Sequence, residues 1–135
     1  MDNAKRQEIR QRLIKSQRDI GSARRLMVGQ EPYLDTAVYH CQQAAEKALK
    51  AFVTTRDMAF EKTHNLVALL ALCTPCEPGF TQWEEAAAML TPYATEFRYP
   101  GELLEPERSE AEQALAAAEA FVQFIWQLLQ DAIEP

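Results

Sequence analysis

The sequence lacks the features that mark several whole classes of protein. Only four of its 135 residues are glycine, and a composition of 47% hydrophobic and 25% charged residues excludes collagen-like, low-complexity and disordered chains. β-branched residues never gather into an alternating run, which disfavours β-strands. The longest uninterrupted apolar stretch, residues 66–73, has eight residues, whereas a membrane span needs about 20. We therefore expect a globular protein without a transmembrane helix.

Cysteine is also scarce, and its number is odd. Cys41, Cys73 and Cys76 fit reduced thiols better than a disulfide framework. Cys73 and Cys76 form a CxxC pair, but a structural zinc needs about four ligands, and only Cys41, His40 and His64 would remain. Redox thiols are activated at a helix N-terminus, whereas this pair follows a predicted helix C-terminus. We expect no metal and no cofactor.

Strong helix formers are abundant. Ala, Leu, Glu and Gln together supply 61 of the 135 residues, which favours an all-α fold. The length fits a single domain over residues 1–135. The first residues are polar and carry no apolar core of a secretory signal, so we expect a cytoplasmic protein.

Apolar periodicity predicts the helices. A stripe through Ile9, Leu13, Ser16, Ile20, Ala23 and Met27 predicts a helix over about residues 4–28, which ends before Gly29 and Pro32. A second helix opens with Asp35 as its N-cap and ends near Arg56, and many small residues on it allow a neighbouring helix to approach closely.

Three further helical segments follow. Thr63 caps a short leucine-rich helix that we expect to be buried, and residues 81–84 have the capping-box pattern of the next helix, which Pro92 interrupts. A second capping box at residues 109–112 opens a last helix that runs nearly to the end of the chain. The sequence predicts an antiparallel up-and-down four-helix bundle with a short additional helix.

The net charge of -6 hides a gradient along the chain. Residues 1–30 carry eight Lys and Arg against three Asp and Glu, a sum of +5, whereas residues 77–135 carry two against twelve, a sum of -10. This polarity suits a basic first helix beside an acidic last helix, in one chain or across a dimer, or a basic helix that meets an anionic partner. Overall acidity argues against bulk duplex-DNA binding but permits a local RNA or phosphate site.

The basic residues of the first helix coat everything except its core stripe. At 100° per residue, Arg12 and Lys15 lie on one flank, and the other arginines lie on the opposite flank: Arg6, Arg10, Arg18, Arg24 and Arg25. A solvated face explains such a pattern without any ligand, and a surface for RNA, a nucleotide or an acidic partner is the alternative.

Three strings of residues resemble the HEPN domain family. They are residues 40–51, with the string QQAAEKALKA as the most specific part, then Thr-His-Asn-Leu at 63–66, then Phe-Arg-Tyr-Pro at 97–100. The resemblance spans almost the whole chain. It implies a helical bundle that usually dimerises and that occurs beside small nucleotidyltransferases and in toxin–antitoxin pairs.

Many ribonucleases of that family carry an Arg followed, after four to six residues, by a His. Counted from Arg98, the corresponding positions here hold Leu103, Leu104 and Glu105. Leu cannot transfer a proton, and a phosphate would repel Glu105, so the usual partner for attack by a ribose 2′-hydroxyl is missing. We therefore interpret the chain as lacking the ribonuclease motif.

Four residues are candidates for binding a nucleotide or RNA. Arg98 can clamp a phosphate and Tyr99 can stack on a base, although Arg98 can equally cap a helix end and Tyr99 can cover the core edge. His64 opens a helix and can address an anion or simply hydrogen-bond locally. Lys47 can meet a phosphate or a partner subunit, whereas Glu46 and Lys50 have the spacing of a solvated surface pair. His40 is expected to be structural or to lie at a subunit interface.

Three hypotheses about function follow. The first is a dimeric, non-catalytic binding subunit that engages a nucleotide or RNA and partners a separate nucleotidyltransferase. The second is a ribonuclease toxin in which Arg98 works with His64 of the same or the opposite subunit. The third is a purely structural dimerisation module.

Overall fold

A computed structural model describes residues 1–98, 100 and 104–134, and these residues form helices and turns without any strand. The long helices are α1 (Asn3–Leu26), α2 (Leu34–Thr55) and α5 (Arg108–Ile133). The short ones are α3 (Leu66–Cys73), α4 (Glu84–Leu90) and the 3₁₀ helices η1 (Pro78–Trp83) and η2 (Thr91–Ala94). The all-α class is confirmed. Of the four substantial helices expected, three are long, and the remaining one is divided into η1, α4 and η2.

The predicted core stripe of α1 is confirmed. Every member of that stripe is buried, including the hydroxyl of Ser16, which donates to the carbonyl of Ala44 on α2 at 2.6 Å. The side chain of Asp2 accepts a hydrogen bond from the Lys5 amide and caps the helix, which ends at Leu26, two residues before the expected position. Gly29 follows with φ 96°, a left-handed conformation that glycine adopts without strain.

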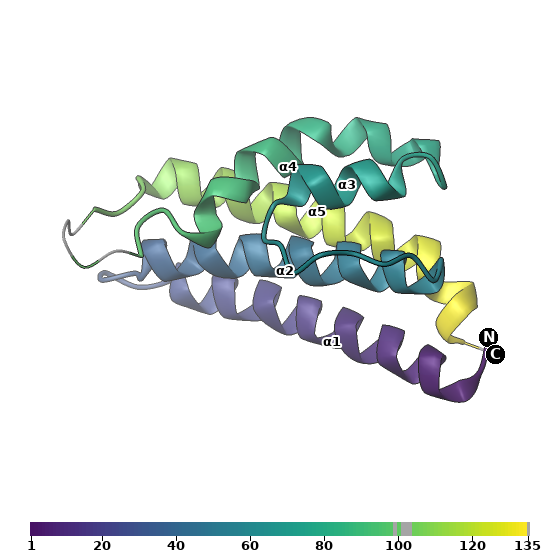
Figure 1. Cartoon of the computed structure of the whole chain (residues 1–135). Coiled ribbons are helices and arrows are strands. Elements are labelled where there is room, and N and C mark those ends of the chain that lie inside the picture. The colour runs from purple at the N-terminus through teal and green to yellow at the C-terminus, as the bar shows by residue number, and fades with distance from the viewer. Residues whose placement is uncertain (99, 101–103, 135) are drawn as a thin grey trace.

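Helix α2 lies at the centre of the molecule. It packs against α1, α3 and α5, and α1 and α2 run in opposite directions (Figure 1). Its apolar side consists mainly of small residues that are buried: Ala37, Val38, Cys41, Ala44, Ala45, Ala48 and Ala51. The N-cap is Tyr33, and Asp35 is not the cap: its carboxylate accepts from the adjacent Thr36 amide in the first turn.

Two further details of the short helices differ from the sequence expectation. The N-cap of α3 is Asn65, whose side chain accepts hydrogen bonds from the amides of Val67 and Ala68. Thr63, the expected cap, accepts a hydrogen bond only from the amide of Asn65, which precedes the helix. The helix is not wholly buried, because Val67 is 46% and Leu72 is 36% exposed. One face packs on α2 and the other is open.

The capping boxes predicted for the last two helices do not form. Residues 78–83 wind as a 3₁₀ helix capped by Glu77, so Thr81 lies inside that turn, and α5 begins at Arg108, one residue before Ser109. Pro78 and Pro92 each stand at the start of a 3₁₀ helix, where a missing amide costs nothing. Proline thus explains why this part of the chain is divided.

The two ends of the chain meet at one end of the molecule (Figure 1). Arg6 Nε donates to the carbonyl of Ala132 at 3.2 Å, and Arg10 donates to the carbonyl of Ile133. Arg24 pairs with Glu119 of α5 at 2.8 Å. The basic first helix therefore lies beside the acidic last helix within one chain, which was one of the expected arrangements. Among the described residues, no helix is both long and apolar enough to cross a membrane.

Candidate binding surface along helix α2

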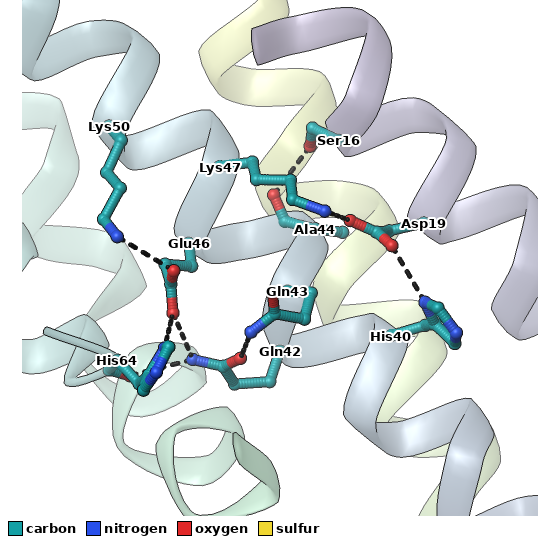
Figure 2. A network of polar contacts seen from close by, with 10 residues as sticks. All are labelled: Ser16, Asp19, His40, Gln42, Gln43, Ala44, Glu46, Lys47, Lys50 and His64. Carbon is teal, nitrogen blue, oxygen red and sulfur yellow. Dashed lines mark hydrogen bonds and ion pairs between the residues drawn. The ribbon is translucent and has the colours of Figure 1, made fainter. Parts of the chain in front are cut away.

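One side of α2 carries polar and aromatic side chains instead of alanines. We call it the α2 strip: Tyr39, His40, Gln42, Gln43, Glu46, Lys47 and Lys50. At 100° per residue these positions fall within about 160° of the helix circumference, so they share one face. All of them are buried or half-buried, with Gln42 fully buried and Glu46 5% exposed. Two carboxylates organise this face, as Figure 2 shows.

The first carboxylate is Asp19 of α1. It is 7% exposed and binds two groups of the strip. His40 Nδ1 lies 2.8 Å from Asp19 Oδ1, and Lys47 Nζ donates to Oδ2 at 2.6 Å (Figure 2). A carboxylate this buried needs cationic or hydrogen-bonding partners, so it fixes both side chains against α1.

The second carboxylate is Glu46, a residue of the strip itself. Lys50 Nζ donates to Oε2 at 2.9 Å, and His64 Nδ1 lies 2.7 Å from Oε1. Gln42 Nε2 donates both to Glu46 Oε1 at 3.1 Å and to the carbonyl of His64 at 2.8 Å (Figure 2). Burial acts to raise the pKa of Glu46, but hydrogen bonds from Lys50, His64 and Gln42 outweigh it and hold the pKa below its ordinary value.

The expectation that Glu46 and Lys50 form a solvated surface pair is therefore half right. The pair exists, but the side chains are only 7% and 15% exposed. The segment that follows α2 turns back over the helix and brings His64 onto Glu46. The His64 side chain itself is 65% exposed, so the ring is held at Nδ1 while Nε2 is available to a ligand.

Arg98 lies at the other end of the strip. Its guanidinium carbon sits 3.8 Å from the centroid of the Tyr39 ring, and the residue is exposed. Phe97 just before it has φ 67°, in the left-handed region, and stacks on Tyr93 with a centroid distance of 6.2 Å. A pocket of about 260 Å³ lies here, lined by Asp35, Thr36, Tyr39, Phe97 and Arg98. A guanidinium on an aromatic face keeps its N–H groups free for a phosphate.

Three of the four predicted binding residues thus lie on α2 or contact it. Lys47 belongs to the α2 strip, His64 contacts it at Glu46, and Arg98 contacts it at Tyr39. Tyr99 lies outside the described residues. Arg98 and His64 are not brought together, because Tyr39 and Glu46 are seven residues apart, about 10 Å along the helix axis.

Sequence reasoning missed the residues that organise the strip. In the sequence, nothing distinguishes Asp19 from the other charged residues of the basic first helix, and Tyr39 belongs to no motif. A signal was present for Asp19, because it follows the buried Ser16 by three residues and so lies close to the core face of α1. Its partners on α2 cannot be deduced without knowing how the two helices face each other.

The cysteines take no part in this surface. Burial raises the pKa of both Cys41 and Cys73 to about 12, with smaller contributions from Glu119 and Asp19 at Cys41 and from Cys76 at Cys73, which keeps these thiols protonated. Cys76 is exposed. Within the described part of the chain, no group of three or more His, Cys, Asp or Glu side chains is placed to hold a metal ion.

Comparison with known proteins supports the resemblance seen in the three strings. No curated protein and no solved structure matches the chain significantly. The sequence model of the HEPN domain matches residues 9–128, a stretch that contains the α2 strip, Asp19, His64 and Arg98. With nearly its whole length matched and an all-helical fold, the chain belongs to the HEPN domain family.

Proposed function

We propose that this chain is a non-catalytic HEPN subunit that binds RNA or a nucleotide through Arg98, Tyr99, His64 and Lys47. Membership of the family supports a nucleotide- or RNA-related role. The observation that carries the proposal is the α2 strip with Arg98 at its end. There, Asp19 and Glu46 orient two lysines and two imidazoles, whose side chains are between 15% and 65% exposed. Fixed cations lose less entropy on binding a phosphate than free ones.

The same proposal covers the assembly and the overall arrangement. The chain acts as one domain and forms a homodimer. It lacks the histidine of the ribonuclease motif after Arg98, and a separate nucleotidyltransferase is the catalytic partner. In this arrangement the segment from Pro78 to Ala94 serves as the third helix of an up-and-down four-helix bundle, and α3 is the short additional helix. A cytoplasmic location suits such partners.

Binding measurements with a matched arginine pair test the proposal. ATP, GTP and single-stranded RNA are titrated at low salt into wild type, Arg98→Ala and Arg56→Ala. Arg56 is the control, because it also stacks on an aromatic ring, that of Phe52 at 5.3 Å, but lies at the far end of α2. We expect Arg98→Ala to weaken binding about ten- to a hundredfold and Arg56→Ala to leave it unchanged, since a charge-assisted hydrogen bond is worth about 1.5 to 3 kcal/mol.

Three results would contradict the proposal. One is wild-type protein that binds none of these ligands and retains no partner in a pull-down. Another is equal loss of binding in both arginine variants, which would point to general electrostatics. If Arg98→Ala and Tyr99→Ala leave every partner unaffected, the chain is a structural dimerisation module instead.

A ribonuclease toxin that uses Arg98 and His64 is the second candidate. It is favoured by the exposed imidazole of His64, whose Nδ1 is bound to buried Glu46 as in many general bases. Because Arg98 contacts the strip seven residues away, the pair would have to meet across two subunits. Cellular RNA is incubated with wild type, Arg98→Ala and His64→Ala: cleavage lost in both variants establishes the enzyme, and no cleavage by wild type rules it out.

A further inference from the structure

The cations of α1 divide between two flanks with different surroundings. On the α5 side, Arg6 and Arg10 donate to the last carbonyls of α5, and Arg24 pairs with Glu119. These three side chains link the first and last helices at the surface of the bundle. On the opposite flank, Arg12 and Lys15 face away from α5, and no carboxylate of α5 contacts them in the described part of the chain.

A groove of about 360 Å³ lies beside this second flank. It is lined by Glu8, Gln11, Arg12, Lys15 and Lys47. Three of these side chains are cations and one is a carboxylate; counted with Asp19, which accepts from Lys47, the groove still carries a net positive charge. Arg12 reaches Glu8 at 3.2 Å through Nη2, while its Nε is buried with no hydrogen-bond partner within the described residues. Lys15 is exposed.

The groove is continuous with the α2 strip. Lys47 belongs to both, since it lines the groove and bonds to Asp19. Phe60 joins them at a second point, because its ring centroid lies 5.9 Å from the guanidinium carbon of Arg12 and 5.7 Å from Lys50 Nζ. From Tyr39, beneath Arg98, to Lys47 is eight residues of α2, about 12 Å along its axis.

We propose that this groove holds the phosphates of a single-stranded RNA whose neighbouring nucleotides contact Arg98. The inference rests on the proposed function and narrows its ligand from any nucleotide to an RNA strand. A phosphate oxygen must lie about 2.7 to 2.9 Å from a cationic nitrogen. Because Arg98 and Lys47 are fixed at separate points along α2, one phosphate cannot contact both side chains. Successive phosphates of one strand can contact them in turn.

An RNA strand fits this surface better than an acidic protein. The strip offers aromatic rings as well as charge, and Tyr39 and Phe60 are both half-buried beside cations. The bases of RNA can stack on such rings, whereas carboxylate side chains have no flat aromatic group that could do so. The acidic last helix of a second copy is a weaker occupant than its charge suggests, because two of its four acids, Glu110 and Glu119, already bind Tyr93 and Arg24 in their own chain.

The test compares a short and a long RNA. Fluorescence anisotropy of labelled uridine dinucleotide and decanucleotide is measured against wild type, the double variant Arg12→Gln/Lys15→Gln, Arg98→Ala and Arg25→Gln. Arg25 is the control, because it is an exposed arginine of α1 on the other flank, ten residues from Lys15. Circular dichroism verifies that each variant is folded.

We expect the double variant to weaken decanucleotide binding about tenfold and to leave dinucleotide binding unchanged. The slope of log K against log salt should fall by about 0.7 for each cation removed, the value for single strands. Arg98→Ala should weaken both RNAs, and Arg25→Gln should behave as wild type.

The outcomes separate this inference from the proposed function. If Arg98→Ala weakens both RNAs while the double variant binds the decanucleotide like wild type, the groove is not an RNA site and the proposed function stands. If wild type binds neither RNA nor nucleotides, the proposed function itself is wrong. If decaglutamate displaces the labelled decanucleotide as well as unlabelled RNA does, the groove takes an acidic protein, and the assignment to RNA fails.

Discussion

Glu46 is the residue on which most of the α2 strip depends. Its carboxylate receives hydrogen bonds from Gln42 and Lys50 of its own helix and from His64 of the segment that follows. A carboxylate that is 5% exposed would be costly to bury alone. It therefore keeps its charge only because these three donors surround it, and they in turn are ordered by it.

Acid should loosen the protein through this residue. The folded pKa of Glu46 lies below its unfolded value, so its contribution to stability is present above about pH 4.3 and is lost as the pH falls through the folded pKa. We expect Glu46→Gln to cost about 1 to 3 kcal/mol at pH 7. We also expect a weaker decrease of the free energy of unfolding between pH 5 and pH 3 than in wild type.

Urea unfolding followed by circular dichroism at several pH values measures both effects. Glu85→Gln is a suitable control, because Glu85 is an exposed acid on α4. A Glu46→Gln variant with the same stability and the same pH profile as wild type would show that the buried carboxylate network contributes nothing.

Phe97 shows how the backbone positions Arg98. A phenylalanine with φ 67° is strained by about 1 to 3 kcal/mol, since its Cβ crowds the backbone in this region. The ring is retained there by stacking on Tyr93, whose hydroxyl donates to Glu110 of α5 at 2.5 Å. Burial, together with that hydrogen bond, raises the pKa of Tyr93 and keeps its proton in place. Arg98 thus leaves the bundle at a defined point.

Among the elements, the pair α1 and α2 sets the position of the strip. The two helices approach closely where Ser16 donates to the carbonyl of Ala44, and both residues are fully buried. Small side chains permit this approach, and the same approach brings Asp19 within reach of His40 and Lys47. A larger residue at this contact should therefore lower the stability of the protein and also move Asp19 away from His40 and Lys47 of the strip.

We expect Ala44→Leu to lower the free energy of unfolding by about 1 to 3 kcal/mol, because extra methyl groups in a packed core force the helices apart. Ala120→Leu is the matched control, since Ala120 is exposed on α5 and should tolerate the change. Thermal unfolding compares the two variants. Equal melting temperatures would mean that the α1–α2 contact is not tightly packed.

The helices themselves were predictable because each carries its own apolar period. Every residue of the α1 stripe is buried as predicted, and the small residues of α2 lie in the core, as their close approach to a neighbouring helix requires. The residues that cap the helices were less predictable, since neighbours such as Thr63 and Asn65 can both accept hydrogen bonds from the first amides of α3. In the structure only Asn65 does so. Burial of Glu46 was not predictable at all, because it arises when residues far along the chain fold over α2.

At the scale of the whole molecule, the acidic sum of -6 conceals separated charges. In helix α1, Arg6, Arg10 and Arg24 contact α5, whereas Arg12 and Lys15 lie beside the α2 strip. An acidic protein can thus present a basic surface to a phosphate while its other faces repel bulk nucleic acid.

The homodimer that we propose is tested by mass. Sedimentation equilibrium should give a particle of twice the 15.3 kDa chain mass, with dissociation on dilution. The result should be the same for Arg12→Gln/Lys15→Gln, because the groove is assigned to RNA and not to the subunit interface. A constant mass of 15.3 kDa at all concentrations would exclude the dimer.

The meeting of Arg6 and Arg10 with the final carbonyls of α5 has a practical consequence. A short flexible tether could join the first residue to the last, and new ends could then be opened in the exposed turn around Gly29. Such a circular permutant would move any attached label from the Arg6 end of the molecule to the opposite end, near Arg98, without altering a single side chain of the α2 strip or the groove.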